Sequence, residues 1–411
     1  MTTLSLARRA AGFVPSPVRD VWEVSMQPGM ISLAGGNPDL SLMGLSWMAS
    51  VSAETIQNQP GRALQYGSGT GDSQLRAAIT ELMAAESINA DPESIQVTSG
   101  SQMGLDLIVK LLCDPGDIVL AEGPTYVGAL GVFGGAGVQT RHVAMDAQGL
   151  IPEDLERVLG ELAAVGTAPK FLYSIPNFHN PTGITLATER RERVVRICAR
   201  FNIPIIEDNP YGLLNFDDHT RPALVSFDPE RVIYLGSFSK ILAPGLRVGW
   251  VSAPHWLRRP LQLAAESTTI CPSSLSQELA SQFIATRPWR KDIAAATAAY
   301  RRRANALCRE LSTMLPQNVN FTLPVGGFFS WVTLPQDWDT AELLEHAIAR
   351  QVVFVQGSSF YADGQGTNQL RLAFSAVAEE QLAEGARRLA NAMNDYAASR
   401  VTAPATLTVD D

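Results

Sequence analysis

Several residue types that carry common functions are scarce in this 411-residue chain. Its only cysteines lie far apart and form no C-x-x-C pair: Cys113, Cys198, Cys271 and Cys308. That spacing indicates neither a zinc site nor a disulfide framework, so we expect reduced thiols. Positive charge is also in deficit, because the formal net charge is -9, which argues against a nucleic-acid-binding surface. A small molecule is therefore the expected partner.

Apolar runs suited to a membrane or a secretory signal are lacking too. The uncharged run at residues 123–140 contains six glycines and a proline, which does not suit a bilayer span. Residues 1–22 carry arginines at positions 8, 9 and 19 and have no unbroken apolar core, so no signal peptide is predicted. We expect a cytoplasmic protein without membrane partners.

Lysine is the last scarce residue type, and one lysine stands out. The chain has four: Lys110, Lys170, Lys240 and Lys291. Lys240 follows the apolar, strand-like residues 231–235 and shares a short stretch with Ser237, Ser239 and Arg247. A lysine amine can condense with an aldehyde to form an imine. Hydroxyls and a guanidinium can bind phosphate oxygens. This combination predicts a site for pyridoxal 5'-phosphate (PLP) with Lys240 as its covalent partner, against the alternative of an ordinary surface lysine.

Two glycine-rich segments add a predicted anion site. Residues 64–71 form a glycine-rich loop that contains Tyr66, and the strand-like residues 95–98 lead through a glycine into a helix that starts near Ser101 and Gln102. This order directs backbone N–H groups and a helix dipole towards an anion. The spacing is not a Walker motif, which favours a cofactor phosphate. A simple helix cap at Ser99 or Ser101 is the alternative.

Polar side chains follow three further strand-like segments. Tyr126 comes after residues 117–122 and could stack on a flat ring. Asn180 lies in an Asn-Pro-Thr-Gly turn that fixes its amide. Asp208 ends the strand-like residues 204–207, where a buried carboxylate is costly unless a cation such as a protonated pyridine nitrogen meets it. Tyr211 could donate to the ring hydroxyl beside Asn180, and a turn cap is the alternative role for Asp208.

The order of segments predicts an α/β fold. Apolar runs alternate with helical stretches between residues 95 and 255, which indicates a mostly parallel sheet with helices on both faces and a ligand site at the carboxyl ends of its strands. We divide the chain into four parts: 1–44 as N-terminal arm and part of a small domain, 45–287 as large cofactor-binding domain, 288–400 as C-terminal small α+β domain, and 401–411 as disordered tail.

The small domain is expected to contain a long helix, 288–315, strands at 327–334, 352–355 and 369–374, a helix at 340–349, and a closing helix to about 397. We interpret Arg301, Arg302 and Arg303 as the solvated face of the long helix. Arg371 is the one basic residue in an apolar strand. A buried arginine favours a bidentate anion such as an amino-acid carboxylate, and an internal salt bridge is the alternative.

Taken together, residues 16–389 resemble the fold-type I PLP-dependent aminotransferases of class I/II, in particular the 2-aminoadipate/kynurenine aminotransferase-like branch. The resemblance implies a seven-stranded-type sheet and a homodimer with shared active sites. It implies that Lys240 moves a proton between the substrate and the cofactor, that Asp208 pairs with the ring nitrogen, and that Asn180 and Tyr211 bind the ring oxygen beside the stacked Tyr126. The implied phosphate ligands are Ser101, Gln102, Ser237, Ser239, Arg247 and, from the neighbouring subunit, Tyr66.

The resemblance also implies a substrate site. Arg371, aided by Asn180 and the backbone at Gly36, would hold the substrate carboxylate, and Arg19 would reach its side chain. Residues 37–42 and 67–71 depart from the usual pattern of the branch, so the substrate stays open. The implied reaction is ping-pong transfer of an amino group from an L-amino acid to a 2-oxo acid. Elimination, cyclisation or oxidation of an amino acid on the same fold is the alternative, and a non-enzymatic PLP-sensing regulator domain is a remote one.

Overall fold

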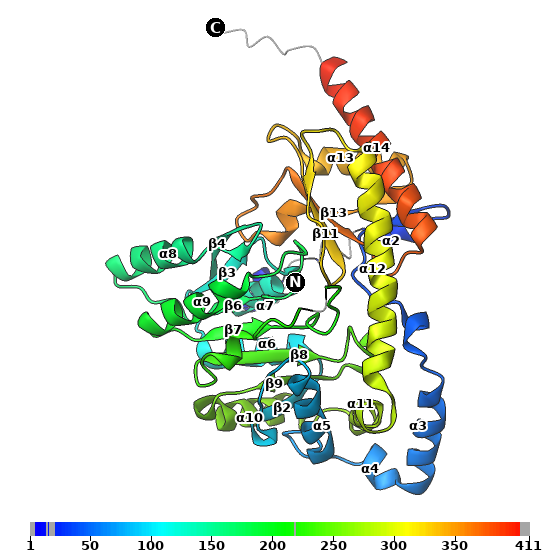
Figure 1. Ribbon diagram of the computed structural model, residues 1–411. Coiled ribbons are helices and arrows are strands. Elements are labelled where there is room, and N and C mark those ends of the chain that lie inside the picture. The colour runs from blue at the N-terminus through cyan, green and yellow to red at the C-terminus, as the bar shows by residue number, and fades with distance from the viewer. Residues whose placement is uncertain (1–4, 14, 16–20, 218, 403–411) are drawn as a thin grey trace.

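The computed structural model describes residues 5–13, 15, 21–217 and 219–402 (Figure 1). Its centre is an eight-stranded sheet with the order β2-β9-β8-β7-β6-β3-β4-β5. The strands are β2 (Ile95–Thr98), β3 (Ile118–Gly123), β4 (Gln139–Asp146), β5 (Gly149–Leu150), β6 (Leu172–Ser174), β7 (Ile205–Asp208), β8 (Val232–Ser237) and β9 (Gly249–Ser252). The predicted α/β fold with a mostly parallel sheet is confirmed. The observed sheet differs from the prediction in two details: β9 is antiparallel to both of its neighbours, and the two-residue β5 adds an eighth, antiparallel strand.

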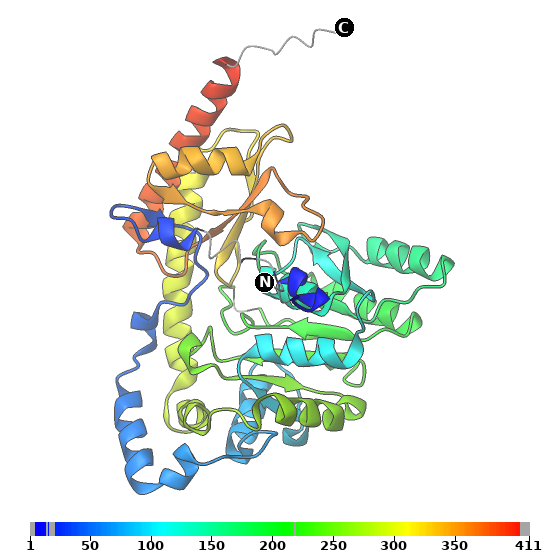
Figure 2. The same cartoon turned by 180° about the vertical axis from the view of Figure 1, so that it is seen from behind.

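Helices cover both faces of this sheet. They are α5 (Ser73–Ala84), α6 (Ser101–Leu112), α7 (Val127–Ala136), α8 (Pro152–Ala164), α9 (Thr188–Arg200), α10 (His255–Thr269) and α11 (Ser274–Thr286). Val119 and Leu120, successive residues of β3, belong to two different hydrophobic clusters because side chains alternate across a strand. The cluster at Val119 includes residues of α6, α7 and α10, and the cluster at Leu120 includes residues of α5, α8, α9 and α11. Figure 2 shows α6 and α10 across the rear face.

A smaller sheet of four strands has the order β10-β11-β14-β13. Its strands are β10 (Asn320–Phe321), β11 (Phe329–Thr333), β13 (Val355–Gln356) and β14 (Gln369–Ala373), and its helices are α12 (Trp289–Met314), α13 (Thr340–Ala349) and α14 (Glu379–Thr402). The long α12 runs beside both sheets (Figure 1). A separate pair, β1 (Ile31–Ser32) and β12 (Val352–Val353), is parallel and joins the N-terminal segment to this region.

Two boundaries predicted for this region were wrong. The strand expected at 352–355 is divided at Phe354, because β12 pairs with β1 while β13 pairs with β14. The closing helix continues past residue 397 to Thr402, and residues 403–411 of the predicted tail lie outside the described part of the chain. The proposed division into domains stays a prediction.

The remaining helical segments are η1 (Arg8–Gly12), α2 (Trp22–Ser25), η2 (Leu40–Met43), α3 (Trp47–Asn58), α4 (Pro60–Leu64), η3 (Pro92–Ser94), η4 (Leu224–Ser226), η5 (Pro244–Leu246) and η6 (Gly357–Phe360).

Two of these helices, α3 and α4, stand at the margin of the molecule. Both views place α3 and α4 at the outer edge of the molecule (Figures 1 and 2). Only Thr55 of α3 is buried. Ile56, Leu64 and Tyr66 keep exposed apolar surface.

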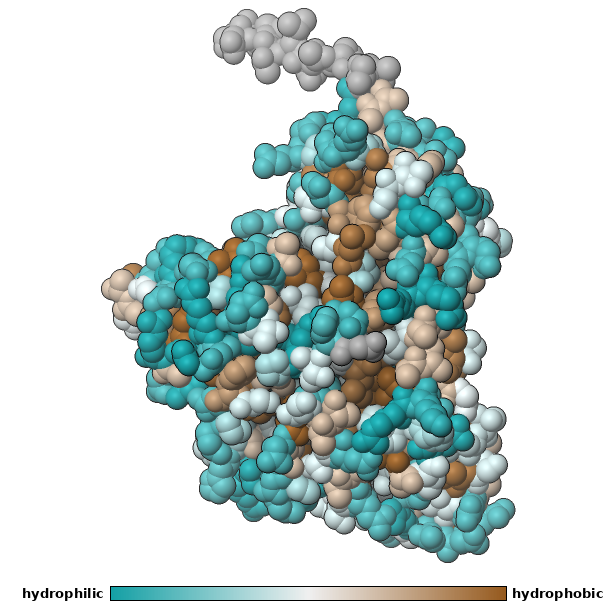
Figure 3. Space-filling view, viewed as in Figure 1, coloured by the Kyte–Doolittle hydropathy of each residue, from teal (hydrophilic) through white to brown (hydrophobic). Residues whose placement is uncertain are grey.

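The surface seen in Figure 3 is mostly polar, with apolar residues gathered in a hollow between the upper and lower halves. Within the described ranges, no helix combines the length and the apolar character needed to span a bilayer.

Candidate active site

A cavity of about 400 Å³ lies where β3, β6, β7 and β8 end, at the shared carboxyl edge of the main sheet. A cavity of this size suits a small ligand. Twelve of the predicted site residues line it: Gly36, Ser101, Gln102, Tyr126, Asn180, Asp208, Tyr211, Ser237, Ser239, Lys240, Arg247 and Arg371. The structure therefore brings together residues that lie more than 300 positions apart in the sequence, such as Gly36 and Arg371.

Lys240 directs a primary amine into the cavity from the turn after β8. Its Nζ donates to the backbone oxygen of Gly36 at 3.1 Å. Burial lowers the pKa of Lys240 to about 8, and the nearby charges of Arg371 and Arg247 act in the same direction. A substantial fraction of the amine is therefore neutral near physiological pH, which is the state that attacks a carbonyl carbon.

Asp208, at the end of β7, keeps one carboxylate oxygen without a partner. Its Oδ2 accepts a hydrogen bond from the Tyr173 hydroxyl at 2.6 Å, while Oδ1 is buried and has no hydrogen-bond partner. Burial raises the pKa of Asp208 to about 6, against the opposing effects of Tyr173 and Lys240. Neither oxygen caps the following turn, so the structure does not support that alternative. A buried oxygen in this state needs a cationic or N–H donor.

Arg371, on β14, is a buried cation that also keeps a free donor. Its Nη1 donates to Asn180 Oδ1 at 2.9 Å and its Nη2 to the backbone oxygen of Ala34 at 2.6 Å, whereas Nε has no partner. The rings of Phe329 and Phe360 lie 4.4 and 5.0 Å from the guanidinium carbon. Burial lowers the pKa of Arg371 to about 10.

No carboxylate of the described residues forms an ion pair with Arg371, so the structure does not support an internal salt bridge. Arg371 is only 2% exposed, and a buried guanidinium without a counter-ion suits the carboxylate of a ligand.

An anion cradle forms around the start of α6. Its N-cap, Gly100, offers no side chain to the free backbone N–H groups and has φ +83°. A Cβ at Gly100 would lie 2.3 Å from Arg247 Nη2, so glycine is needed for this close approach. Ser237 Oγ donates to Ser239 Oγ at 2.9 Å, which places two hydroxyls side by side. Helix dipole, hydroxyls and guanidinium together suit a phosphate.

The remaining predicted cavity residues are aromatic or amide side chains. Tyr126 occupies the N-cap position of α7, and burial together with the charge of Asp208 raises its pKa. Burial also raises the pKa of Tyr211, while a hydrogen bond with Asn180 opposes the shift. Gln102 lines the cavity, but its Nε2 already donates to the Gly128 backbone oxygen at 2.7 Å. Its side-chain amide is therefore less available to a ligand than predicted.

Tyr66, predicted to act from the neighbouring subunit, does not line the cavity of its own chain, whereas several unpredicted residues contribute to the site. Tyr66 is 74% exposed on the loop after α4, and Arg19 lies outside the described residues. Sequence reasoning missed Tyr173, although a tyrosine in a buried strand next to that of Asp208 was a usable signal. It also missed Phe329 and Phe360, because no local pattern distinguishes them from ordinary core residues.

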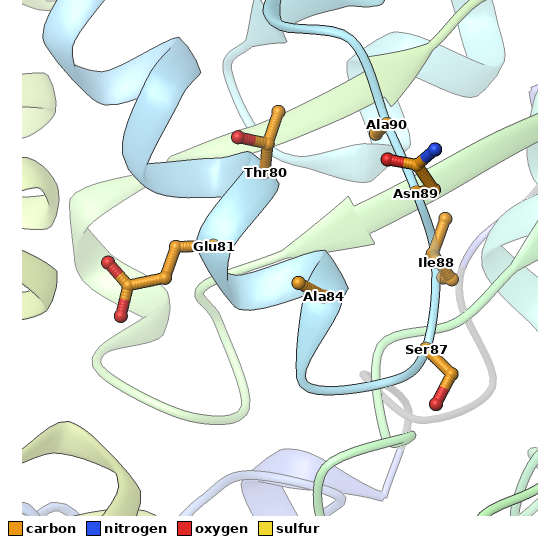
Figure 4. Close-up of a pocket in the computed structure, with 7 residues that line it drawn as sticks. All are labelled: Thr80, Glu81, Ala84, Ser87, Ile88, Asn89 and Ala90. Carbon is orange, nitrogen blue, oxygen red and sulfur yellow. The ribbon is translucent and has the colours of Figure 1, made fainter.

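A second hollow, of about 480 Å³, lies at the end of α5 and carries no comparable set of groups (Figure 4). Its lining is Thr80, Glu81, Ala84, Ser87, Ile88, Asn89 and Ala90. The carboxylate of Glu81 pairs with Arg290 at 3.1 Å. This hollow therefore offers no unpaired carboxylate and no lysine, histidine or cysteine.

Comparison with known proteins agrees with this geometry. Residues 28–389 match the family "Aminotransferase class I and II". The chain is 36% identical over 392 residues to aromatic-amino-acid aminotransferase 1 of Thermococcus litoralis, which covers 95% of this chain and 94% of that protein.

Two solved structures are similar along nearly their whole length. A kynurenine aminotransferase of Pyrococcus horikoshii, in complex with PMP, has a TM-score of 0.91 at 34% identity and covers 95% of this chain and 97% of its own. LysN, the alpha-aminoadipate aminotransferase of Thermus thermophilus, complexed with N-(5'-phosphopyridoxyl)-L-leucine, has a TM-score of 0.89 at 32% identity and covers 96% of this chain and 100% of its own.

Proposed function

This chain belongs to the class I and II aminotransferases, and from that premise we propose which of its residues carry out PLP-dependent transamination. One cavity combines a low-pKa amine at Lys240, an unpartnered carboxylate oxygen at Asp208 and an anion cradle at α6. This donor and acceptor set fits PLP, whose aldehyde, protonated ring nitrogen and phosphate need these three partners. The unpartnered Oδ1 of Asp208 is the observation that carries the proposal.

The residues of the cavity divide the work of the reaction. When bound, PLP supplies an aldehyde and an electron-withdrawing ring, and it keeps the amino group between the two halves of a ping-pong cycle. Asp208 Oδ1 holds a proton on the ring nitrogen. Arg371 binds the substrate carboxylate, with its guanidinium oriented by Asn180 Oδ1. Lys240 Nζ would take the proton from the substrate α carbon, a role for which its lowered pKa suits it.

We also propose that the working form is a cytoplasmic homodimer. Ile56, Leu64 and Tyr66 present apolar surface on the marginal segment formed by α3, α4 and the following loop. Such a patch favours burial against a second copy, in which Tyr66 would reach the neighbouring cavity. Sedimentation should then give a dimer, and Tyr66→Phe should weaken PLP binding without changing the oligomeric state.

A trapping experiment tests the cofactor and its attachment. Purified protein incubated with PLP and then reduced with borohydride should carry a stable PLP adduct, the label, on Lys240, as peptide mapping can show. Lys240→Ala should carry none, and Lys110→Ala, which removes an exposed amine paired with Asp106, should behave as the wild type. An absence of label on Lys240 in the wild type would contradict the proposal.

Separate half-reactions test the transfer itself. An amino donor alone should convert the bound cofactor to its amine form, and a 2-oxo acid alone should convert it back. The names of the relatives make an aromatic amino acid, kynurenine and 2-aminoadipate the first donors to test. Release of ammonia without an acceptor would instead indicate elimination or oxidation.

A further inference from the structure

Residues 34–39, which we call the cavity rim, supply two backbone acceptors to the site. The Ala34 oxygen accepts from Arg371 Nη2 at 2.6 Å, and the Gly36 oxygen accepts from Lys240 Nζ at 3.1 Å. The backbone hydrogen bonds that continue from β1 end at Leu33, which donates to the Val353 oxygen and accepts from the Ala373 N–H. Other contacts must therefore fix the cavity rim.

Those contacts come from α12 and from the residue Ser375, which follows β14. Asp39 Oδ2 accepts from Arg303 Nη2 at 2.6 Å, and the Asp39 backbone N–H donates to the Tyr300 hydroxyl at 3.1 Å. Arg303 Nη1 donates to the Ser375 backbone oxygen, and Ser375 Oγ donates to the Asn37 oxygen at 2.6 Å. Arg303 therefore binds both the cavity rim and the end of the strand that carries Arg371.

This pair is partly withdrawn from water, contrary to the interpretation of Arg303 as solvated. The Arg303 and Asp39 side chains are 12% and 20% exposed, whereas the side chain of the neighbouring Arg302 is 61% exposed. Burial alone would raise the pKa of Asp39, but hydrogen bonds from Ser41 and Arg303 outweigh it and hold that pKa below its usual value. Asp39 is therefore ionised at neutral pH, and the pair is a charge-assisted contact.

We propose that Asp39 and Arg303 are positioning residues for substrate binding: they hold the cavity rim so that Arg371 and Lys240 meet the substrate carboxylate and α carbon in register. The inference rests on the proposed function. Neither residue lines the cavity, so each acts through the backbone of residues 34–37. A carboxylate site depends on such support because small displacements of its groups lose much of the binding.

The test compares reconstituted Asp39→Asn, Arg303→Gln and Arg303→Lys with a matched control, Arg302→Gln, which removes an exposed ion pair with Glu379 one residue away. The probe is the acid that lacks the amino group of the established donor, 3-phenylpropanoate where that donor is phenylalanine. Calorimetry should show its affinity lowered on the order of 10- to 100-fold in the first two variants. Arg303→Lys should fall between them and the wild type, and Arg302→Gln should match the wild type.

Two further measurements separate positioning from stability. KM for the amino donor should rise more than kcat falls, and thermal midpoints show whether folding is affected. Asp39→Asn keeps the acceptor oxygen for Ser41, so this variant is expected to fold. If the Asp39 and Arg303 variants have lower thermal midpoints but bind the probe within twofold of the wild-type affinity, the inference is overturned. A wild type that neither binds the probe nor transfers an amino group would instead overturn the proposed function.

Discussion

Replacing Asp208 by Asn should stabilise the cofactor-free protein while it impairs the reaction. In the cofactor-free state, burial raises the pKa of Asp208 from 3.8 to about 6. A group whose pKa is higher in the folded state contributes stability fully below its unfolded pKa, and this contribution is lost as the pH rises through the folded value. The pH window is therefore about 4 to 6, and at neutral pH the ionised carboxylate opposes folding.

The size of the effect follows from that difference. A shift from 3.8 to about 6 corresponds to about 3 kcal/mol of free energy at pH 7, at roughly 1.4 kcal/mol per pKa unit. An uncharged amide of the same shape removes this cost. The cofactor-free Asp208→Asn protein should therefore gain up to about 3 kcal/mol in its free energy of unfolding at pH 7, and gain little at pH 4.

The same change should lower catalysis. The neutral amide cannot pair as an anion with the protonated ring nitrogen. The loss of this buried charged contact should cost about 3 kcal/mol or more, which corresponds to roughly a 100-fold slower half-reaction. Higher stability together with lower activity is expected when a functional group destabilises the folded protein.

Urea unfolding of the cofactor-free protein between pH 4 and 8 measures the first effect, and single-turnover spectroscopy measures the second. Asp217→Asn is the control of opposite sign. Burial would raise the pKa of Asp217, but the hydrogen bonds from Arg221 and the His219 backbone N–H and the charge of Arg221 together outweigh it, and the pKa lies below its usual value. The amide should therefore reduce stability at neutral pH. An Asp208→Asn protein that is less stable than wild type at pH 7, or equally active, would refute the reasoning.

Three other experiments, one on the wild type and two on variants, probe the rest of the site. The rate at which the wild type captures PLP, followed by absorbance, should rise with pH around a midpoint of about 8, because neutral Lys240 is the reactive form; a flat profile would contradict this. Arg371→Lys should raise KM for both substrates on the order of 100-fold, since a single ammonium cannot replace a bidentate guanidinium, and steady-state kinetics with unchanged KM would argue against the role. Gly100→Ala should release PLP at least tenfold faster in a dissociation assay, because its Cβ would meet Arg247, whereas Gly116→Ala, with similarly positive φ but open space, should change only stability.

Much of the cavity was predictable because its residues follow strands. Asn180, Asp208 and Ser237 end or follow parallel strands with clear apolar patterns, so their convergence at one edge follows from the topology of the sheet. Arg371 was predictable for a different reason, since a single charge in an apolar strand requires a partner.

Long-range contacts without a local pattern were not predictable. The ion pair of Arg303 with Asp39 joins residues 264 positions apart, and nothing in the helical pattern of three consecutive arginines indicates which one turns inward. The division of the strand at Phe354 likewise depends on which partner strands lie on each side. Both features arise from packing between distant segments, which local patterns do not determine.

The unbroken course of α12 limits how the length of the chain can vary. Its 26 residues begin at the buried Trp289 and carry Arg303 in the same helix. Each residue of an α-helix turns the chain by about 100° and advances it by about 1.5 Å. An insertion or deletion between Trp289 and Arg303 would therefore swing the guanidinium to another side of the helix and separate it from Asp39. Homologues should vary in length in their loops and keep the spacing between these two positions constant.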